Sequence, residues 1–155
     1  MKLIHIILLI LFSATSWAEK VQVTSDNMKA YDAKKEIHFI GNAKVIQRKD
    51  WIHGNEIIVY LDKDNQAEKY VAEGKVTFEV HREDALYKGK ADKVTYYPKK
   101  EEYVLTGKAV IDDIVNKRHV NGNKIVLDKK TGNVDVKGSG KKPIKVIFDI
   151  GKKSE

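Results

Sequence analysis

Residues 70–78 read Y-V-A-E-G-K-V-T-F, and this stretch decides the fold. Apolar residues and a glycine occupy every second position, while Val71, Glu73, Lys75 and Thr77 lie between them on the other face. When a pattern repeats every two residues, alternate side chains lie on opposite faces of a strand. The stretch therefore predicts a β-strand with one buried and one solvated face. The residues on the buried face are Tyr70, Ala72, Gly74, Val76 and Phe78.

The same pattern recurs at residues 37–45, 103–111 and 134–138, with glycine at positions 41, 74, 107 and 138. A shorter alternating run that begins with Asp or Asn precedes each glycine, at residues 26–30, 55–59, 92–96 and 123–127. A period near 33 also occurs in helical repeat proteins, but alternation by two favours strands. Glycine weakens a strand interior unless a bend or bulge requires it, so we expect each unit to bend there. The sequence predicts an all-β fold of bent, twisted antiparallel strand repeats around an apolar interior.

Composition excludes several classes of function. The chain has 155 residues and no cysteine, which excludes disulfides, thiol chemistry and cysteine-bound zinc. Lys and Arg total 29 against 22 Asp and Glu, for a formal charge of +7. A basic protein of this kind could bind nucleic acid, an anionic membrane surface or a phosphorylated ligand.

The first eighteen residues have the organisation of a secretory signal. Met1-Lys2 is basic, residues 3–12 are almost wholly apolar, and small residues lead to Ala18. About ten apolar residues are too few for a spanning helix, which needs about 20, although a retained membrane anchor is the alternative. We expect cleavage after Ala18, which removes Lys2 and lowers the charge to +6. Export argues against nucleic acid as a partner.

The repeats resemble the OstA-like family over residues 21–140, in the runs G-N-A-K-V, G-K-V-T-F and G-K-A-V-I and in the D-N-M-K-A, G-N-E-I-I-V and A-D-K-V-T-Y runs before them. The resemblance implies an open β-jellyroll at 19–140, in the periplasm, whose interior holds the lipid A acyl chains of lipopolysaccharide. It also implies end-to-end stacking, head to tail, that bridges inner-membrane LptC-like and outer-membrane LptD-like proteins. Residues 141–155 would form a final strand and a basic tail. The family implies no cofactor.

Strand parity gives the candidate lipid-binding residues of the interior. One alternative is a protein-only structural or adaptor domain whose interior is a filled core; another is the membrane-anchored LptC-like relative. Small inward residues such as Ala43, Ala72 and Ala109 leave room for acyl chains. A one-residue bulge would invert part of the parity. The predicted residues are Val23, Ala30, Phe39, Ile57, Val59, Phe78, Tyr96, Leu105, Ile125 and Leu127.

Exposed sheet edges provide candidate surfaces for self-association. The first predicted strand, 21–25, has few charges, and the last strands, 134–137 and 144–150, are apolar and alternating. Such edges pair with another copy by strand addition, and a head-to-tail contact that does not close forms a filament. The alternative is that the C-terminal tail pairs within its own sheet.

No pattern in the sequence indicates catalysis or metal binding. His38, His53, His81 and His119 lie in separate predicted strands without metal-ligand spacing. The segment 62–66 (D-K-D-N-Q) lacks the glycine and glutamate of a calcium loop and predicts a polar turn. The adjacent pairs Asp112-Asp113 and Glu101-Glu102 would point to opposite faces of a strand. We therefore expect a binding protein, with lysines that either attract lipid phosphates or keep the surface soluble.

Overall fold

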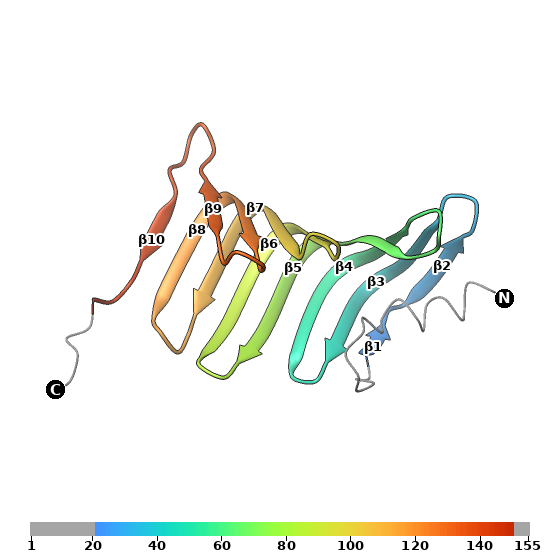
Figure 1. Ribbon diagram of the computed structural model, residues 1–155, viewed down its shortest axis with the longest axis horizontal. Coiled ribbons are helices and arrows are strands. Elements are labelled where there is room, and N and C mark those ends of the chain that lie inside the picture. The colour runs from blue at the N-terminus through green and yellow to red at the C-terminus, as the bar shows by residue number, and fades with distance from the viewer. Residues whose placement is uncertain (1–20, 151–155) are drawn as a thin grey trace.

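The computed structural model describes residues 21–150, and these residues form one antiparallel sheet of ten strands (Figure 1). The predicted signal at 1–18 lies outside the described residues. The all-β fold and its antiparallel order are confirmed. None of the described elements is an apolar helix long enough to span a membrane. The strands are β1 Val21–Thr24, β2 Asn27–Tyr31, β3 Glu36–Gln47, β4 Asp50–Leu61, β5 Ala67–Arg82, β6 Ala85–Tyr97, β7 Glu102–Asp113, β8 Arg118–Asp128, β9 Val134–Lys137 and β10 Lys145–Ile147.

The strands follow chain order across the sheet, and each end of the sheet is split between two short strands. At one end, β1 pairs with residues 44–47 of β3, whereas β2 pairs with residues 36–40. At the other end, β9 pairs with residues 124–127 of β8 and β10 with residues 119–121. The sheet therefore has a β2/β9 half and a β1/β10 half, and strands β3 to β8 run through both.

At three of the four repeated glycines, two consecutive residues with positive φ separate the two halves of the sheet. Gly41, Gly74 and Gly107 have φ between 80 and 85°, and the residue after each also has positive φ. The strand register shifts at each of these positions. Only glycine adopts such backbone readily, so the three glycines mark the bulges at which β3, β5 and β7 pass from one half to the other.

In three of the four units, the Asp or Asn that opens the shorter run lies against the repeated glycine. A Cβ atom on Gly74 would lie 2.5 Å from the side-chain nitrogen of Asn55, and Asp26 and Asp92 crowd Gly41 and Gly107 in the same way. Gly138 differs from the expected pattern: its φ is not positive, and backbone atoms of residues 142–144 surround it. Here the chain leaves the sheet after β9 and returns as β10, so no strand continues through a bulge.

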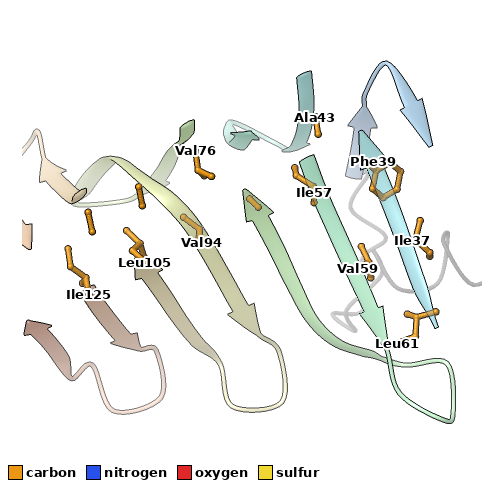
Figure 2. Close-up of a cluster of buried hydrophobic side chains, with 13 residues drawn as sticks. Ile37, Phe39, Ala43, Ile57, Val59, Leu61, Val76, Val94, Leu105 and Ile125 are labelled. Atoms are coloured by element: carbon orange, nitrogen blue, oxygen red, sulfur yellow. The ribbon is translucent and has the colours of Figure 1, made fainter. Parts of the chain in front are cut away.

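One hydrophobic cluster occupies the inner face of both halves (Figure 2). In the β2/β9 half it includes Ile37, Ile57 and Ile125, and near the bulges it includes Ala43 and Val76. Four of its members, Ala43, Val76, Ala109 and Ile125, have no solvent exposure at all. The alternating residues of the sequence repeats thus meet in a single apolar interior.

Glycine allows close packing on the inner face of the β1/β10 half. The Phe78 ring of β5 lies over Gly89 of β6, where an added Cβ would come within 2.1 Å of the ring. Where the two halves meet on β8, Gly122 lies beneath Val136 of β9, and an added Cβ would come within 2.7 Å of that side chain. Because glycine has no side chain, the large side chain opposite it packs into the interior without overlap.

The outer face is polar, and lysines cover its aromatic rings. The Nζ atom of Lys44 lies 4.9 Å from the ring centre of Trp51, and that of Lys69 lies 4.5 Å from the ring centre of Tyr60. Similar cation–π contacts join Lys34 to Tyr31 and Lys100 to Tyr97. The lysine side chains shield these rings from water while keeping the ammonium groups solvated.

Three outward residues at the centre of the sheet are buried, which the alternation did not predict. Ile58, Val71 and Thr95 pair across β4, β5 and β6 and are at most 7% exposed. These strands have neighbours on both sides, so side chains in the middle of the outer face are covered by adjacent rows. Strand parity predicted that Val71 faces outward, but it did not predict that Val71 is buried.

Candidate functional site: the apolar interior

The interior is lined by a row of side chains from every strand between β3 and β8. Strands β3, β5 and β7 contribute Phe39, Ala72 and Leu105, and the intervening strands contribute Val59 and Val94. Partly buried residues of the β1/β10 half pack against this cluster; they include Val23, Val45, Ile52, Phe78, Ile111 and Val120. Since β1 and β10 do not pair with each other, the sheet stays open.

Three tyrosines form a stack at the margin of the β2/β9 half. The ring centres of Tyr96 and Tyr103 are 4.4 Å apart, and those of Tyr70 and Tyr96 are 6.1 Å apart, with the planes within 22° of parallel. Burial raises the pKa of Tyr70 and of Tyr103 to about 12, so both phenols are neutral at physiological pH. An uncharged aromatic row with polar tips suits the boundary between an apolar interior and water.

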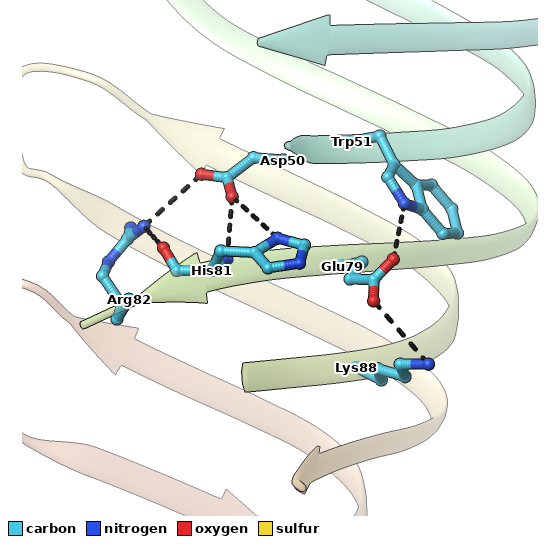
Figure 3. Close-up of polar contacts among 6 residues, drawn as sticks. All are labelled: Asp50, Trp51, Glu79, His81, Arg82 and Lys88. Carbon is cyan, nitrogen blue, oxygen red and sulfur yellow. Dashed lines mark hydrogen bonds and ion pairs between the residues drawn. The ribbon is translucent and has the colours of Figure 1, made fainter. Parts of the chain in front are cut away.

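Charged residues occupy the margin of the β1/β10 half (Figure 3). Asp50 accepts a hydrogen bond of 2.7 Å from the backbone N–H of His81, and its other oxygen lies 3.4 Å from Arg82 Nη1. Burial contributes most to the raised pKa of Tyr103. The charge of Arg82 lowers this pKa, and the charge of Asp50 raises it. Asp50, His81 and Arg82 thus form a polar cluster at the margin of the β1/β10 half.

An ion pair between buried Asp113 and exposed Arg118 joins the two ends of the turn between β7 and β8. Asp113 is 4% exposed and accepts hydrogen bonds from Arg118 and Asn116. Burial opposes ionisation of Asp113, but these donors outweigh it and lower the pKa of its carboxyl. The adjacent Asp112 contacts His119 instead. The two neighbouring aspartates therefore serve separate structural contacts.

The structure places the ten predicted interior residues as follows. Phe39, Ile57, Val59, Leu105 and Ile125 belong to the buried cluster, and Val23 and Phe78 pack against it. Tyr96 is half-buried within the tyrosine stack, and Leu127 is half-buried opposite Tyr103. Ala30 is exposed, because β2 is an end strand with no neighbour on its outer side. Their contact with lipid stays a prediction.

Eight members of the buried cluster were absent from the predicted set: Ile37, Ala43, Leu61, Ala72, Val76, Ala91, Val94 and Ala109. Leu61 and Val94 belong to the cluster and are each 5% exposed. Leu61 continues the alternation of Ile57 and Val59, and Val94 precedes Tyr96 by two residues, so strand parity was the signal that could have found both.

Both ends of the sheet carry exposed apolar residues beside unpaired strand edges. At the β1/β2 end, Met28 is 48% exposed; at the β9/β10 end, Val146 and Phe148 are 46% and 59% exposed. The predicted final strand 144–150 is shorter than expected, because only residues 145–147 pair with β8. The tail therefore pairs within its own sheet through one edge and leaves the other edge free.

The polar side chains of the described residues make structural hydrogen bonds rather than a metal site. Within residues 21–150, no three His, Asp or Glu side chains lie close enough together to hold a metal ion. The oxygen Oδ1 of Asp62 accepts the backbone N–H groups of Asp64 and Gln66, which makes residues 62–66 the polar turn expected from the sequence.

His38 is held on the outer face between two glutamates. Its Nδ1 lies 2.7 Å from Glu56 and its Nε2 2.8 Å from Glu36, while Tyr31 contacts the ring edge-on and Lys29 is its partner across the strands. Burial lowers the pKa of His38, but the bonds to Glu36 and Glu56 outweigh this and raise it overall. Protonated His38 therefore stabilises the fold.

We expect His38→Gln to cost about 1 kcal/mol at pH 5.5 and much less at pH 8.5. A raised folded-state pKa stabilises fully below the unfolded pKa of about 6.5, and the contribution is lost as pH rises through the folded value. Urea unfolding of both proteins at the two pH values measures the effect. His53→Gln, without such contacts, is the control. An equal loss at both pH values would contradict the role of protonation.

An open, bent antiparallel sheet with an apolar interior and free edges at both ends defines the class of protein as an open β-jellyroll. The sequence family described as "LptA/(LptD N-terminal domain) LPS transport protein" matches residues 22–133. The chain belongs to this family of lipopolysaccharide transport proteins, which confirms the OstA-like resemblance.

Among solved structures, the chain is similar to LptH from Pseudomonas aeruginosa, described as the LptA-homologous periplasmic component of the lipopolysaccharide transport device. The two share 19% sequence identity with a TM-score of 0.71, over 84% of this chain and 96% of LptH. This likeness confirms the LptA-like jellyroll fold. No curated protein sequence matches the chain. Family and fold are those of a transport protein rather than an enzyme.

Proposed function

We propose that this protein is a periplasmic carrier of lipopolysaccharide, exported by a cleaved signal at residues 1–18, and that its interior shields the acyl chains of lipid A. The single observation that carries the proposal is the continuous apolar inner face of a sheet that does not close. Family membership and the LptA-like fold support it.

The side chains at the two margins suit a phosphorylated, glycosylated lipid. Acyl chains pack against the half-buried layer of Val45, Ile52, Phe78 and Ile111, which lies over the fully buried cluster. Burying apolar lipid surface contributes about 25 cal/mol per Å². Sugars and phosphates remain at the water boundary, beside the tyrosine stack and Arg82.

We also propose that copies stack end to end and connect an inner-membrane LptC-like protein with an outer-membrane LptD-like protein. Strands β1 and β2 are antiparallel to β3, and β9 and β10 are antiparallel to β8. Because directions alternate through the whole sheet, β9 and β10 run opposite to β2 and β1 of a copy placed next in line. Such a copy continues both halves with antiparallel pairing.

A protein-only adaptor is the second candidate, and the full burial of Ala43, Val76 and Ile125 favours it. In that case the interior is a filled core and only the sheet edges bind. The two candidates differ in whether lipid accompanies the protein.

Lipid extraction from the purified protein tests the carrier function. We expect protein expressed with its signal in a lipopolysaccharide-producing bacterium, and purified without detergent, to yield lipid A acyl chains by mass spectrometry. An exported, cysteine-free β protein of unrelated fold, purified in parallel, is the control. Protein that yields no more lipid A than this control would support the adaptor.

A further inference from the structure

The net charge of the protein is concentrated at one end of the sheet. Residues 21–117 contain 17 Lys or Arg and 17 Asp or Glu, so this part of the chain is neutral. Residues 118–150, which form β8 to β10 and their connections, contain eight cations and three anions, for a net charge of +5. Because strand order follows chain order, this excess lies at the β9/β10 end of the molecule (Figure 1).

The paired lysines of this end lie on the outer face, together with Ile147, whereas Val136 and Val146 lie on the inner face. Lys137 of β9 pairs with Lys124, and Lys145 of β10 pairs with Asn121, all on the outer face. Val136 and Val146 alternate with them and pair with inward residues of β8. Within the described part of the chain, no carboxylate lies within ion-pair distance of Lys124, Lys137 or Lys145. The end therefore combines an apolar inner surface, two free strand edges and a basic outer rim.

The opposite end of a second copy fits this surface in strand direction but not in charge. Residues 21–47, which form β1 to β3, contain four cations and three anions, for a net charge of +1. When two copies are placed in line, an end with a net charge of +5 would therefore face an end with a net charge of +1. Like charges across an interface slow association and disfavour the pair.

We infer that the β9/β10 end is built to receive the edge of another antiparallel sheet whose outer face is acidic, in preference to a second copy of this chain. The inference rests on the proposed end-to-end assembly and adds the chemistry of the preferred partner. An acidic outer face pairs with Lys137 and Lys145, while backbone groups of β9 and β10 complete strand ladders and the apolar interior continues. A bilayer surface cannot satisfy strand edges, so these edges favour a protein partner.

A variant of the chain itself serves as the probe. Lys29→Glu on β2 changes the charge of residues 21–47 from +1 to −1, and Lys90→Glu on β6 makes the same change at mid-sheet. Both lysines are exposed, face outward and make no ion pair among the described residues. Sedimentation velocity of the full mature chain, in about 20 mM and about 500 mM NaCl, gives the association constants.

We expect Lys29→Glu to self-associate at least about threefold more tightly than wild type in low salt, and to weaken as salt rises. Wild type and Lys90→Glu should instead strengthen as salt screens the repulsion. Adding Lys137→Glu and Lys145→Glu to the Lys29→Glu variant should remove its gain.

Equal salt dependence of Lys29→Glu and Lys90→Glu would overturn the inference while leaving stacking intact. Monomers of every variant at both salt concentrations would instead contradict the end-to-end assembly itself. A third outcome also overturns the inference: if Lys137→Glu/Lys145→Glu abolishes sedimentation with phosphatidylglycerol vesicles without changing the behaviour of Lys29→Glu, the basic rim serves a membrane.

Discussion

Replacing Phe78 with Glu is expected to reduce lipopolysaccharide binding about a hundredfold while the β-sheet circular dichroism spectrum is retained. Phe78 is half-buried and lies over Gly89 on the inner face of the β1/β10 half. A carboxylate there places a charge against the acyl chains, and an unpaired polar or charged group in an apolar site costs at least about 2–4 kcal/mol. Because Phe78 is not fully buried, the carboxylate reaches water in the lipid-free protein and the sheet survives.

Thr77→Glu is the matched control for this prediction. Thr77 precedes Phe78 on the same strand, is exposed, and points to the outer face. The Thr77→Glu substitution adds the same charge on the outer face, away from the interior, so lipopolysaccharide binding should be unchanged. Displacement of a fluorescent fatty-acid probe measures binding for all three proteins. If Phe78→Glu unfolds the domain, the interior is a filled core rather than a lipid site; equal losses in both variants would show a non-specific charge effect.

Gly74→Ala is expected to destabilise the fold by about 2–4 kcal/mol. Gly74 has φ +80, and an added Cβ would lie 2.5–2.9 Å from three atoms of Asn55. The substitution combines left-handed strain with a steric clash at the bulge where β5 passes between the halves. Urea unfolding, followed by circular dichroism, measures the loss.

Gly132→Ala separates the two causes. Gly132 also has positive φ, +75, but no atom lies within 4 Å of an added Cβ. Its loss should be about 1 kcal/mol, from backbone strain alone. Asn55→Gly should restore part of the stability of Gly74→Ala by removing the crowded side chain. Similar losses for the two alanine variants, with no rescue, would show that the clash with Asn55 contributes nothing.

Alternation predicted the strands and much of the inner face, but not how parity changes along every strand. On β3, inward Phe39 and Ala43 are four residues apart, so parity is preserved across the bulge. On β4, inward Gly54 and Ile57 are three apart, so parity inverts between the halves. The inward position of Ile52 therefore follows from the register of the pairing strands, which the sequence of β4 alone does not contain.

The lysines illustrate the same limit for the surface. Their excess could be counted from the sequence, yet two functions of that excess depend on the fold. Lys44 and Lys69 cover outward aromatic rings, which requires knowing the residues beside them on neighbouring strands. Lys137 and Lys145 gather at one free end because the sheet keeps chain order. The basic end could not be assigned until strand order was known.

The carrier function depends on whether the apolar interior accepts lipid, and a titration of the purified wild-type protein with lipopolysaccharide measures this directly. We expect saturable displacement of a fluorescent fatty-acid probe that is bound to the interior. Displacement should remain in Thr77→Glu and be lost in Phe78→Glu. If the wild-type protein binds no probe, or if lipopolysaccharide leaves the bound probe in place, the interior is a closed core and the carrier function is wrong.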